Sequence, residues 1–209
     1  MKDAVLNTLS EPCDAVWRDR GSKFLAYARR VSQDQELALF VKELKARWPD
    51  ATHHCVAARW NPDLMLELAQ DDGEPAGTAG LPILNQLRSR NLIDVACVVV
   101  RYFGGTQLGK PGLIAAYGTA AANCLDNGAL SPIEKKTLLR VSTSYTEIKL
   151  IEYQVRKSGA QIRSSSFTDT IIYDLAVPDA ATAAFLADLT RLGQNRLTIE
   201  PLGSEWAAK

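Results

Sequence analysis

The last third of the chain alternates between strand-like and helix-like stretches. β-branched runs with a period of two predict strands, and apolar residues at helical spacing predict helices. The expected elements are strand Leu138–Tyr145, helix Glu147–Lys157, strands Gln161–Phe167 and Thr170–Val177, a helix from Pro178-Asp179 to Arg191, and a short last strand Arg196–Leu202. This order predicts a ferredoxin-like βαββαβ domain over residues 137–209.

The first two thirds mix strands and helices less regularly. The expected elements are strands Cys13–Asp19 and Lys23–Val31, a helix Gln33–Arg47 capped by Ser32, strands Thr52–Trp60 and Leu64–Ala69, helix Thr78–Ser89, strand Ile93–Tyr102 and helix Leu113–Asp126. This order favours an α+β domain over a doubly wound sheet. We expect it to span residues 1–133, with Ser131–Lys136 as a short polar connector to the second domain.

Composition narrows the class of protein. The chain has 209 residues, 46% of them hydrophobic and 23% charged, which is typical of one or two globular domains. No apolar run is long enough to span a membrane and the first residues lack a signal core, so a cytoplasmic location is expected. The 24 basic and 24 acidic side chains cancel. A contact with a polyanion therefore needs a local basic patch.

Cysteine and histidine usage argues against a metal site. Cys13, Cys55, Cys97 and Cys124 form no CxxC motif, which favours reduced thiols. The chain has 2 histidines, in the run His53-His54-Cys55, and on a strand His54 faces away from the other two. Two local ligands are too few for a typical zinc site. No catalytic residue, metal or cofactor is predicted.

A glycine-rich loop, Gly104–Gly112, follows one expected strand and opens a helix, with Arg101 and Lys110 on either side. Glycines let backbone N–H groups approach an anion, and a helix N-terminus favours negative charge. The spacing matches neither GxxxxGK(S/T) nor GxGxxG. The loop is therefore either a site for an anion or partner, or a set of tight turns and close contacts. Of Tyr102 and Phe103, one ring is expected in the core and the other could stack on a base.

A second loop, Asp71–Pro75, holds three acidic residues within four positions. Such carboxylates could hold Mg²⁺ through water or transfer protons. They could equally cap the helix that begins near Thr78. Both interpretations remain open at this point.

Together the two segments resemble a known family. The runs DDGEPAGTAGLPIL and VVVRYFGGTQLGKPGLIAAYG, with THHCVA at Thr52–Ala57, are similar to the IMPACT family, in particular to its bacterial two-domain, YigZ-type members. The resemblance covers roughly residues 15–128, and the βαββαβ remainder is similar to the small domain that follows in bacterial members. It implies a ribosomal protein S5 domain 2-like fold followed by a ferredoxin-like domain. Elongation factor G has the same two fold classes in the same order.

The resemblance also implies a link to translation, because eukaryotic members regulate translation by binding a ribosome-associated activator of a stress kinase. The motif positions that it carries over to the acidic loop include Asp71, Asp72, Gly73, Glu74, Pro75 and Thr78. Two positions depart from the family pattern. Pro111 replaces a common glycine and so removes one N–H, and Ala115 replaces a frequent arginine. Losing that cation weakens the case for a polyanion ligand.

The favoured hypothesis is a non-enzymatic binding protein linked to translation regulation, which contacts RNA, the ribosome or a translation-associated protein. Between Arg88 and Lys110 the chain has four cations against Asp94 alone. The expected binding residues are Arg88, Arg90, Arg101, Tyr102, Gly104, Gly105, Gly109 and Lys110. The alternative is a metal-dependent enzyme that handles a phosphate or nucleotide with the acidic and glycine-rich loops. The oligomeric state stays open.

Overall fold

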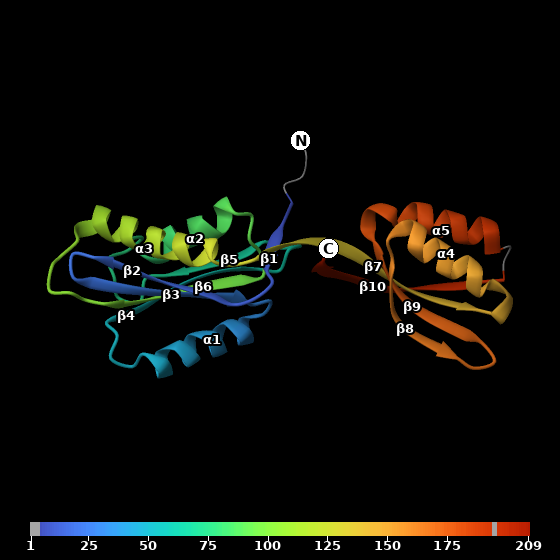
Figure 1. The fold of residues 1–209 in the computed structure, drawn as a ribbon, viewed down its shortest axis with the longest axis horizontal. Helices are drawn as coiled ribbons and strands as arrows, with labels where there is room; N and C mark the ends of the chain where they lie inside the picture. The colour runs from blue at the N-terminus through green and yellow to red at the C-terminus, as the bar shows by residue number, and fades with distance from the viewer. Residues whose placement is uncertain (1–4, 194–195) are drawn as a thin grey trace. The chain divides into compact units, whose positions relative to one another are not determined.

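The computed structural model describes residues 5–193 and 196–209. The chain divides into two compact units, the first ending at Pro132 and the second beginning at Ile133 (Figure 1). Each unit has its own sheet and its own buried core.

The first unit is a five-stranded antiparallel sheet with helices on both faces. Its strands lie in the order β2 (Cys13–Asp19), β3 (Ser22–Arg30), β6 (Val95–Tyr102), β4 (His53–Trp60) and β5 (Leu66–Gln70). In Figure 1, α2 (Gly80–Ser89) and α3 (Gly109–Asp126) cover one face, and α1 (Asp34–Arg47) lies on the other. This arrangement is the expected S5 domain 2-like α+β fold.

The central strand β6 explains why the unit has two apolar layers. The apolar residues of β6 are all buried, and successive side chains of a strand point to opposite faces. Cys97 and Val99 pack against the layer that includes Tyr117 of α3. Val98 and Val100 pack against the layer that includes Phe40 of α1.

The second unit confirms the predicted βαββαβ order. Its elements are β7 (Leu130–Thr143), a 3₁₀ turn (Tyr145–Glu147), α4 (Ile148–Ser158), β8 (Gln161–Phe167), β9 (Ile171–Pro178), α5 (Asp179–Gly193) and β10 (Thr198–Ala208). The strands lie in the ferredoxin-like order β10, β7, β9, β8. The core between the sheet and its two helices includes Val141, Ile151 and Phe185.

The prediction of a polar connector at Ser131–Lys136 was wrong, as was that of a short last strand. These residues belong to β7, and β10 pairs with β7 from Thr198 opposite Ser142 to Ala208 opposite Ile133. Lys136 is buried, with its Nζ 3.4 Å from the carbonyl oxygen of Ala208. Cross-strand pairing therefore outweighs the polar composition of this segment.

Two predicted helix starts were also wrong. α3 begins at Gly109 rather than at Leu113, because proline fits the first turn of a helix and Pro111 lies there. The N-cap of α1 is Gln33 rather than Ser32. The backbone N–H and hydroxyl of Ser32 instead donate to the Glu36 carboxylate, at 2.7 and 3.0 Å.

A short strand at the N-terminus was not predicted. β1 (Asn7–Leu9) pairs antiparallel with Leu130–Pro132 at the start of β7. All four cysteines are free, including Cys13 and Cys124, whose sulfur atoms are 3.8 Å apart. In the part of the chain that the structure describes, no helix is both long and apolar enough to cross a membrane.

Candidate functional site

Asp71 fixes the shape of the acidic loop. Its carboxylate accepts hydrogen bonds from the backbone N–H groups of Gly77 (2.8 Å), Ala79 (3.0 Å) and Gly80 (2.9 Å). Burial opposes ionisation of Asp71, but these three donors outweigh it and hold the pKa of Asp71 below its usual value. Because α2 begins at Gly80, Asp71 acts as a distant cap for that helix.

Asp72 ties the same loop to β4 and α1. One carboxylate oxygen accepts the backbone N–H of His54 at 2.6 Å, and the other is 3.4 Å from Lys45 Nζ. The carbonyl oxygen of Asp72 lies 2.8 Å from Nδ1 of His53. As predicted, His53 and His54 point to opposite faces of the sheet: His53 lies against Glu74, 3.8 Å away, and His54 is buried with its Nε2 unpaired.

Glu74, the third acidic residue, is buried and joins the two motif segments. Its Oε1 accepts hydrogen bonds from Arg101 Nη1 at 2.5 Å and from the Tyr117 hydroxyl at 2.7 Å. The Glu74 and Arg101 side chains are 4% and 6% exposed. Burial, together with the neighbouring Cys55, raises the pKa of Tyr117, so its hydroxyl stays protonated and remains a donor. The pairing explains why a carboxylate in one segment accompanies an arginine in the other.

The Arg101 guanidinium lies between aromatic rings. Its central carbon is 5.5 Å from the ring centres of Phe24 and Phe103, and its Nη2 donates to the Ser22 hydroxyl at 3.3 Å. Arg101 is 5% exposed, and its positive charge is neutralised within the protein by the ion pair with Glu74. It positions Phe103, which is 49% exposed, at the surface.

The two segments line a single pocket of about 350 Å³. We call it the two-loop pocket, and it is lined by Glu74, Pro75, Arg101, Phe103, Gln107, Leu108, Gly109, Lys110 and Leu113. The buried Glu74–Arg101 pair is part of its lining. α3 begins at its wall with no side-chain cap, so the first N–H groups of the helix are open to an acceptor.

Gly104 brings the glycine-rich loop against the β2–β3 hairpin. A Cβ atom at Gly104 would lie 1.9 Å from the carbonyl carbon of Gly21, which only glycine avoids. The Gly104 N–H also donates to the Ser22 hydroxyl, at 3.2 Å. The interpretation that loop glycines serve close contacts therefore holds at Gly104. At Gly105 nothing lies within 4 Å of the missing side chain, but its φ of +84° favours glycine, as expected of a tight turn.

This contact places Arg20, at the tip of the hairpin, beside the loop that leads to Lys110. We call Arg18, Arg20, Lys23 and Lys110 the basic rim; Arg18, Arg20 and Lys110 are exposed and Lys23 is half-buried. Lys23 pairs with Arg18 and with Tyr102 in the sheet, so the side chains of Arg18 and Lys23 point to the α1 face, away from the two-loop pocket. Among the residues that the structure describes, none of the four side chains forms an ion pair. The same hairpin carries Asp14 and Asp19 in β2. Sequence reasoning missed Arg20, because only the Gly21–Gly104 contact connects it to the loop.

Other expected binding residues lie elsewhere. Arg88 pairs with Glu67 through its Nε at 3.1 Å, and Arg90 pairs with Asp126 at 2.6 Å. Tyr102 packs edge-on against Trp48 on the α1 side of the sheet. Thr78 is buried and donates its hydroxyl to the Pro75 carbonyl at 2.7 Å.

The structure thus gathers only part of the expected site. Arg101, Gly109, Lys110, Glu74 and Pro75 meet in the two-loop pocket, and Gly104 and Gly105 adjoin it. Asp71, Asp72 and Gly73 lie in the loop that leads to it. Over residues 5–193 and 196–209, no three His, Cys, Asp or Glu side chains are grouped so that they could hold a metal ion. The arrangement is suited to anion binding at a mixed apolar and basic surface.

Comparisons with known proteins find family models and relatives that match this chain. A family model described as "Impact N-terminal domain" matches residues 20–125, and one described as "Domain of unknown function (DUF1949)" matches residues 141–196. "IMPACT family member YvyE" of Bacillus subtilis is 34% identical over 181 residues, which cover 86% of this chain and 82% of the relative. "IMPACT family member YigZ" of Escherichia coli is 34% identical over 197 residues, which cover 90% and 95%.

A solved structure supports the same placement. A crystal structure titled as that of a hypothetical protein superposes with a TM-score of 0.67 at 30% sequence identity, covering 93% of this chain and 95% of that one. "Protein IMPACT homolog" of Saccharomyces cerevisiae is 32% identical over 96 residues, which cover 44% of this chain and 36% of the relative. The matches to the bacterial relatives extend through both units, and the chain belongs to the IMPACT family.

Proposed function

We propose that the protein is a binding module linked to translation, and that it contacts RNA through Arg20 and Lys110 of the basic rim and the exposed ring of Phe103. The observation that carries the proposal is that two cations unpaired within the described residues, Arg20 and Lys110, adjoin the contact between Gly21 and Gly104 beside the exposed ring of Phe103. Single-stranded nucleic acids bind to grooves that combine cations for the phosphates with rings for the bases. Family membership supports the link to translation.

Positive charge and free N–H groups remain in this domain despite the two departures from the family pattern, Ala115 and Pro111. Ala115 is exposed on α3, so the cation that many relatives carry there is missing from the surface of this chain. Arg18, Arg20 and Lys23 supply positive charge to the same domain from a different element. Pro111 removes one N–H from the first turn of α3 but leaves those of Gly109, Lys110 and Gly112.

The enzymatic alternative is less well supported. Its metal would need carboxylate oxygens from the acidic loop. Asp71 uses both oxygens on backbone N–H groups, Asp72 uses both on His54 and Lys45, and Glu74 holds Arg101 and Tyr117. A loop whose three carboxylates are engaged in this way fits a structural role.

Binding can be measured by fluorescence anisotropy with a labelled single-stranded RNA, as a function of salt. Each phosphate contact to a single strand contributes about −0.7 to the slope of log K against log salt. Arg20 and Lys110, the two rim cations beside Phe103, therefore contribute about −1.4 to the slope. The double variant Arg20→Ala/Lys110→Ala should lower the magnitude of the slope by about 1.4, and Phe103→Ala should weaken binding with the slope unchanged.

The matched control is Lys149→Ala/Arg156→Ala, which removes two exposed cations from α4 of the other unit. If it reduces the slope as much as the rim variant does, binding depends on total charge and the proposed site is wrong. Co-sedimentation with ribosomes adds a second readout. Pelleting that fades with salt and is reduced by the rim variant supports the proposal, whereas pelleting that resists salt and nuclease indicates a ribosomal protein partner instead.

A further inference from the structure

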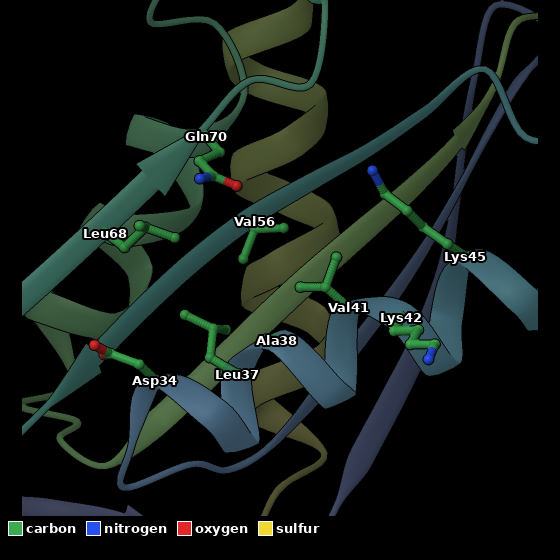
Figure 2. A pocket seen from close by; sticks show the side chains of 9 residues that line it. All are labelled: Asp34, Leu37, Ala38, Val41, Lys42, Lys45, Val56, Leu68 and Gln70. Atoms are coloured by element: carbon green, nitrogen blue, oxygen red, sulfur yellow. The ribbon is translucent and has the colours of Figure 1, made fainter.

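A second surface of the first unit is an open apolar groove. Figure 2 shows it between α1 and the β4–β5 side of the sheet: Leu37 and Val41 project from the helix toward Val56 of β4, and Leu68 comes from β5. The cavity measures about 470 Å³. None of the basic-rim residues lines it.

The groove is open because a single helix, α1, is too narrow to cover the whole of this face of the five-stranded sheet. Neighbouring strands are about 4.8 Å apart, so five strands span about 19 Å, whereas a helix with its side chains is about 10 Å wide. α1 packs over β3, β6 and β4 through Leu37, Phe40 and Leu44, and covers β5 only in part, at Leu68. The opposite face carries two helices and is filled.

The strand that borders the groove has a free edge. β5 lies at the end of the sheet and pairs only with β4. Within the described residues, no hydrogen bond of the Leu66–Gln70 backbone goes to any partner other than β4. Proteins usually blunt such edges with a bulge, a proline or inward-pointing charges. β5 has a regular register and no proline, and its one charge, Glu67, pairs on the opposite face with Arg59 and Arg88.

Apolar side chains continue from the groove onto the surface. At the β4–β5 turn and the start of β5, Leu64, Met65 and Leu66 are 68%, 39% and 39% exposed. Leu66 shares the face of Leu68, because side chains two apart on a strand point the same way. Clustered exposed apolar residues of this kind mark an interaction surface.

Charge at the two ends of the groove restricts what can fill it. Asp34 lies at one end, and Lys42 and Lys45 lie toward the other (Figure 2). Within the described part of the chain, Asp34 and Lys42 form no ion pair, and Lys45 has only an exposed contact with Asp72 at 3.4 Å. A complementary occupant has a basic group near Asp34 and an acidic group near the two lysines.

We propose that β5 and α1 bind an extended segment of a partner protein, which adds to the sheet as a sixth strand. Its main chain pairs with the free edge of β5, and alternate apolar side chains enter the groove. A basic residue of the segment faces Asp34 and an acidic residue faces Lys42 and Lys45. β5 is five residues long, so the segment in contact is about as short.

The test is selection from a displayed library of random twelve-residue peptides on the full-length protein. Ala38 lines the groove and is exposed, so Ala38→Arg fills it without disturbing the core. Leu39→Arg, one position along on the outer face of α1, is the matched control, because Leu39 is 56% exposed and does not line the groove. We expect enriched peptides with alternating apolar residues between opposite charges. Ala38→Arg should weaken their binding at least tenfold, and Leu39→Arg should leave it unchanged.

Hydrogen exchange of the complex gives the second readout. Strand addition should slow exchange of outward-facing amides within Leu66–Gln70. The proposal is overturned if no selected peptide binds the wild-type protein more tightly than the Ala38→Arg variant. It is overturned as well if the selected peptides slow exchange only at amides outside Leu66–Gln70. It is also overturned if sedimentation shows that the wild-type protein is a dimer and that Ala38→Arg is a monomer, because the occupant of the groove is then a second copy of the chain.

Discussion

The buried pair of Glu74 and Arg101 can be tested by removing one partner. Arg101→Ala leaves the Glu74 carboxylate 4% exposed and without a cation. Breaking a buried pair in this way typically costs about 3–5 kcal/mol of unfolding free energy. For a unit of this size, that corresponds to a fall in Tm of about 10–20 °C.

The assay is thermal and urea unfolding followed by tryptophan fluorescence. Trp17, Trp48 and Trp60 lie in the first unit and Trp206 in the second, so the signal reports mainly on the unit that is perturbed. Arg88→Ala is the matched control, because its pair with Glu67 is exposed and such pairs contribute about 0–1 kcal/mol.

A rescue experiment distinguishes loss of the charge pair from loss of packing. Glu74→Leu alone would leave the Tyr117 hydroxyl without its acceptor. The triple variant Glu74→Leu/Arg101→Met/Tyr117→Phe removes every member of the network, and replacing all partners with apolar groups can be nearly neutral. We expect it to be more stable than Arg101→Ala. A loss for Arg101→Ala no larger than that for Arg88→Ala would refute the reasoning.

Three further predictions concern residues of the first unit. Gly104→Ala should destabilise the protein by more than about 1 kcal/mol through its clash with Gly21, whereas Gly118→Ala, whose Cβ would make only ordinary contacts with Pro82 and Gln86 at 4.0 and 3.8 Å, should stabilise it by about 0.5–1 kcal/mol; unfolding in urea compares them. Because the pKa of Asp71 is lowered in the folded protein, its carboxylate contributes fully to stability above about pH 5, and this contribution is lost as the pH falls below about 4. The difference in unfolding free energy between wild type and Asp71→Asn should therefore shrink as the pH is lowered below about 4. The hydrogen bond of Cys13 to the neighbouring thiol and its burial raise the pKa of Cys13, so it should react with iodoacetamide at neutral pH more slowly than free cysteine does.

Periodicity in the sequence was sufficient for most of the fold. The apolar run Val95–Val100 predicted the central buried strand, and alternation with helical spacing predicted the βαββαβ unit. The failures lie at Ser131–Lys136 and at the last strand. There the stabilising contacts are cross-strand pairs between distant segments, which a local pattern does not record.

The candidate site could be predicted only in part, because charge counted along the chain does not show which charges are neutralised. Arg88, Arg101 and Arg90 meet carboxylates 21, 27 and 36 positions away. Arg20 was missed for the converse reason. It is far from the glycine-rich loop in sequence, and folding brings the two together at the Gly21–Gly104 contact.

The extent of β7 determines how the two units can be produced separately. A fragment beginning at residue 137 would lack Ile133 to Lys136, which pair with Glu205 to Ala208 of β10. The end of β10 would then be unpaired along both sides, and an unprotected strand of this kind promotes aggregation. A cut between Pro132 and Ile133 keeps these pairs in one fragment and the pairing of β1 with Leu130–Pro132 in the other. The soluble yields of fragments cut at the two positions would therefore differ for reasons unrelated to the stability of either core.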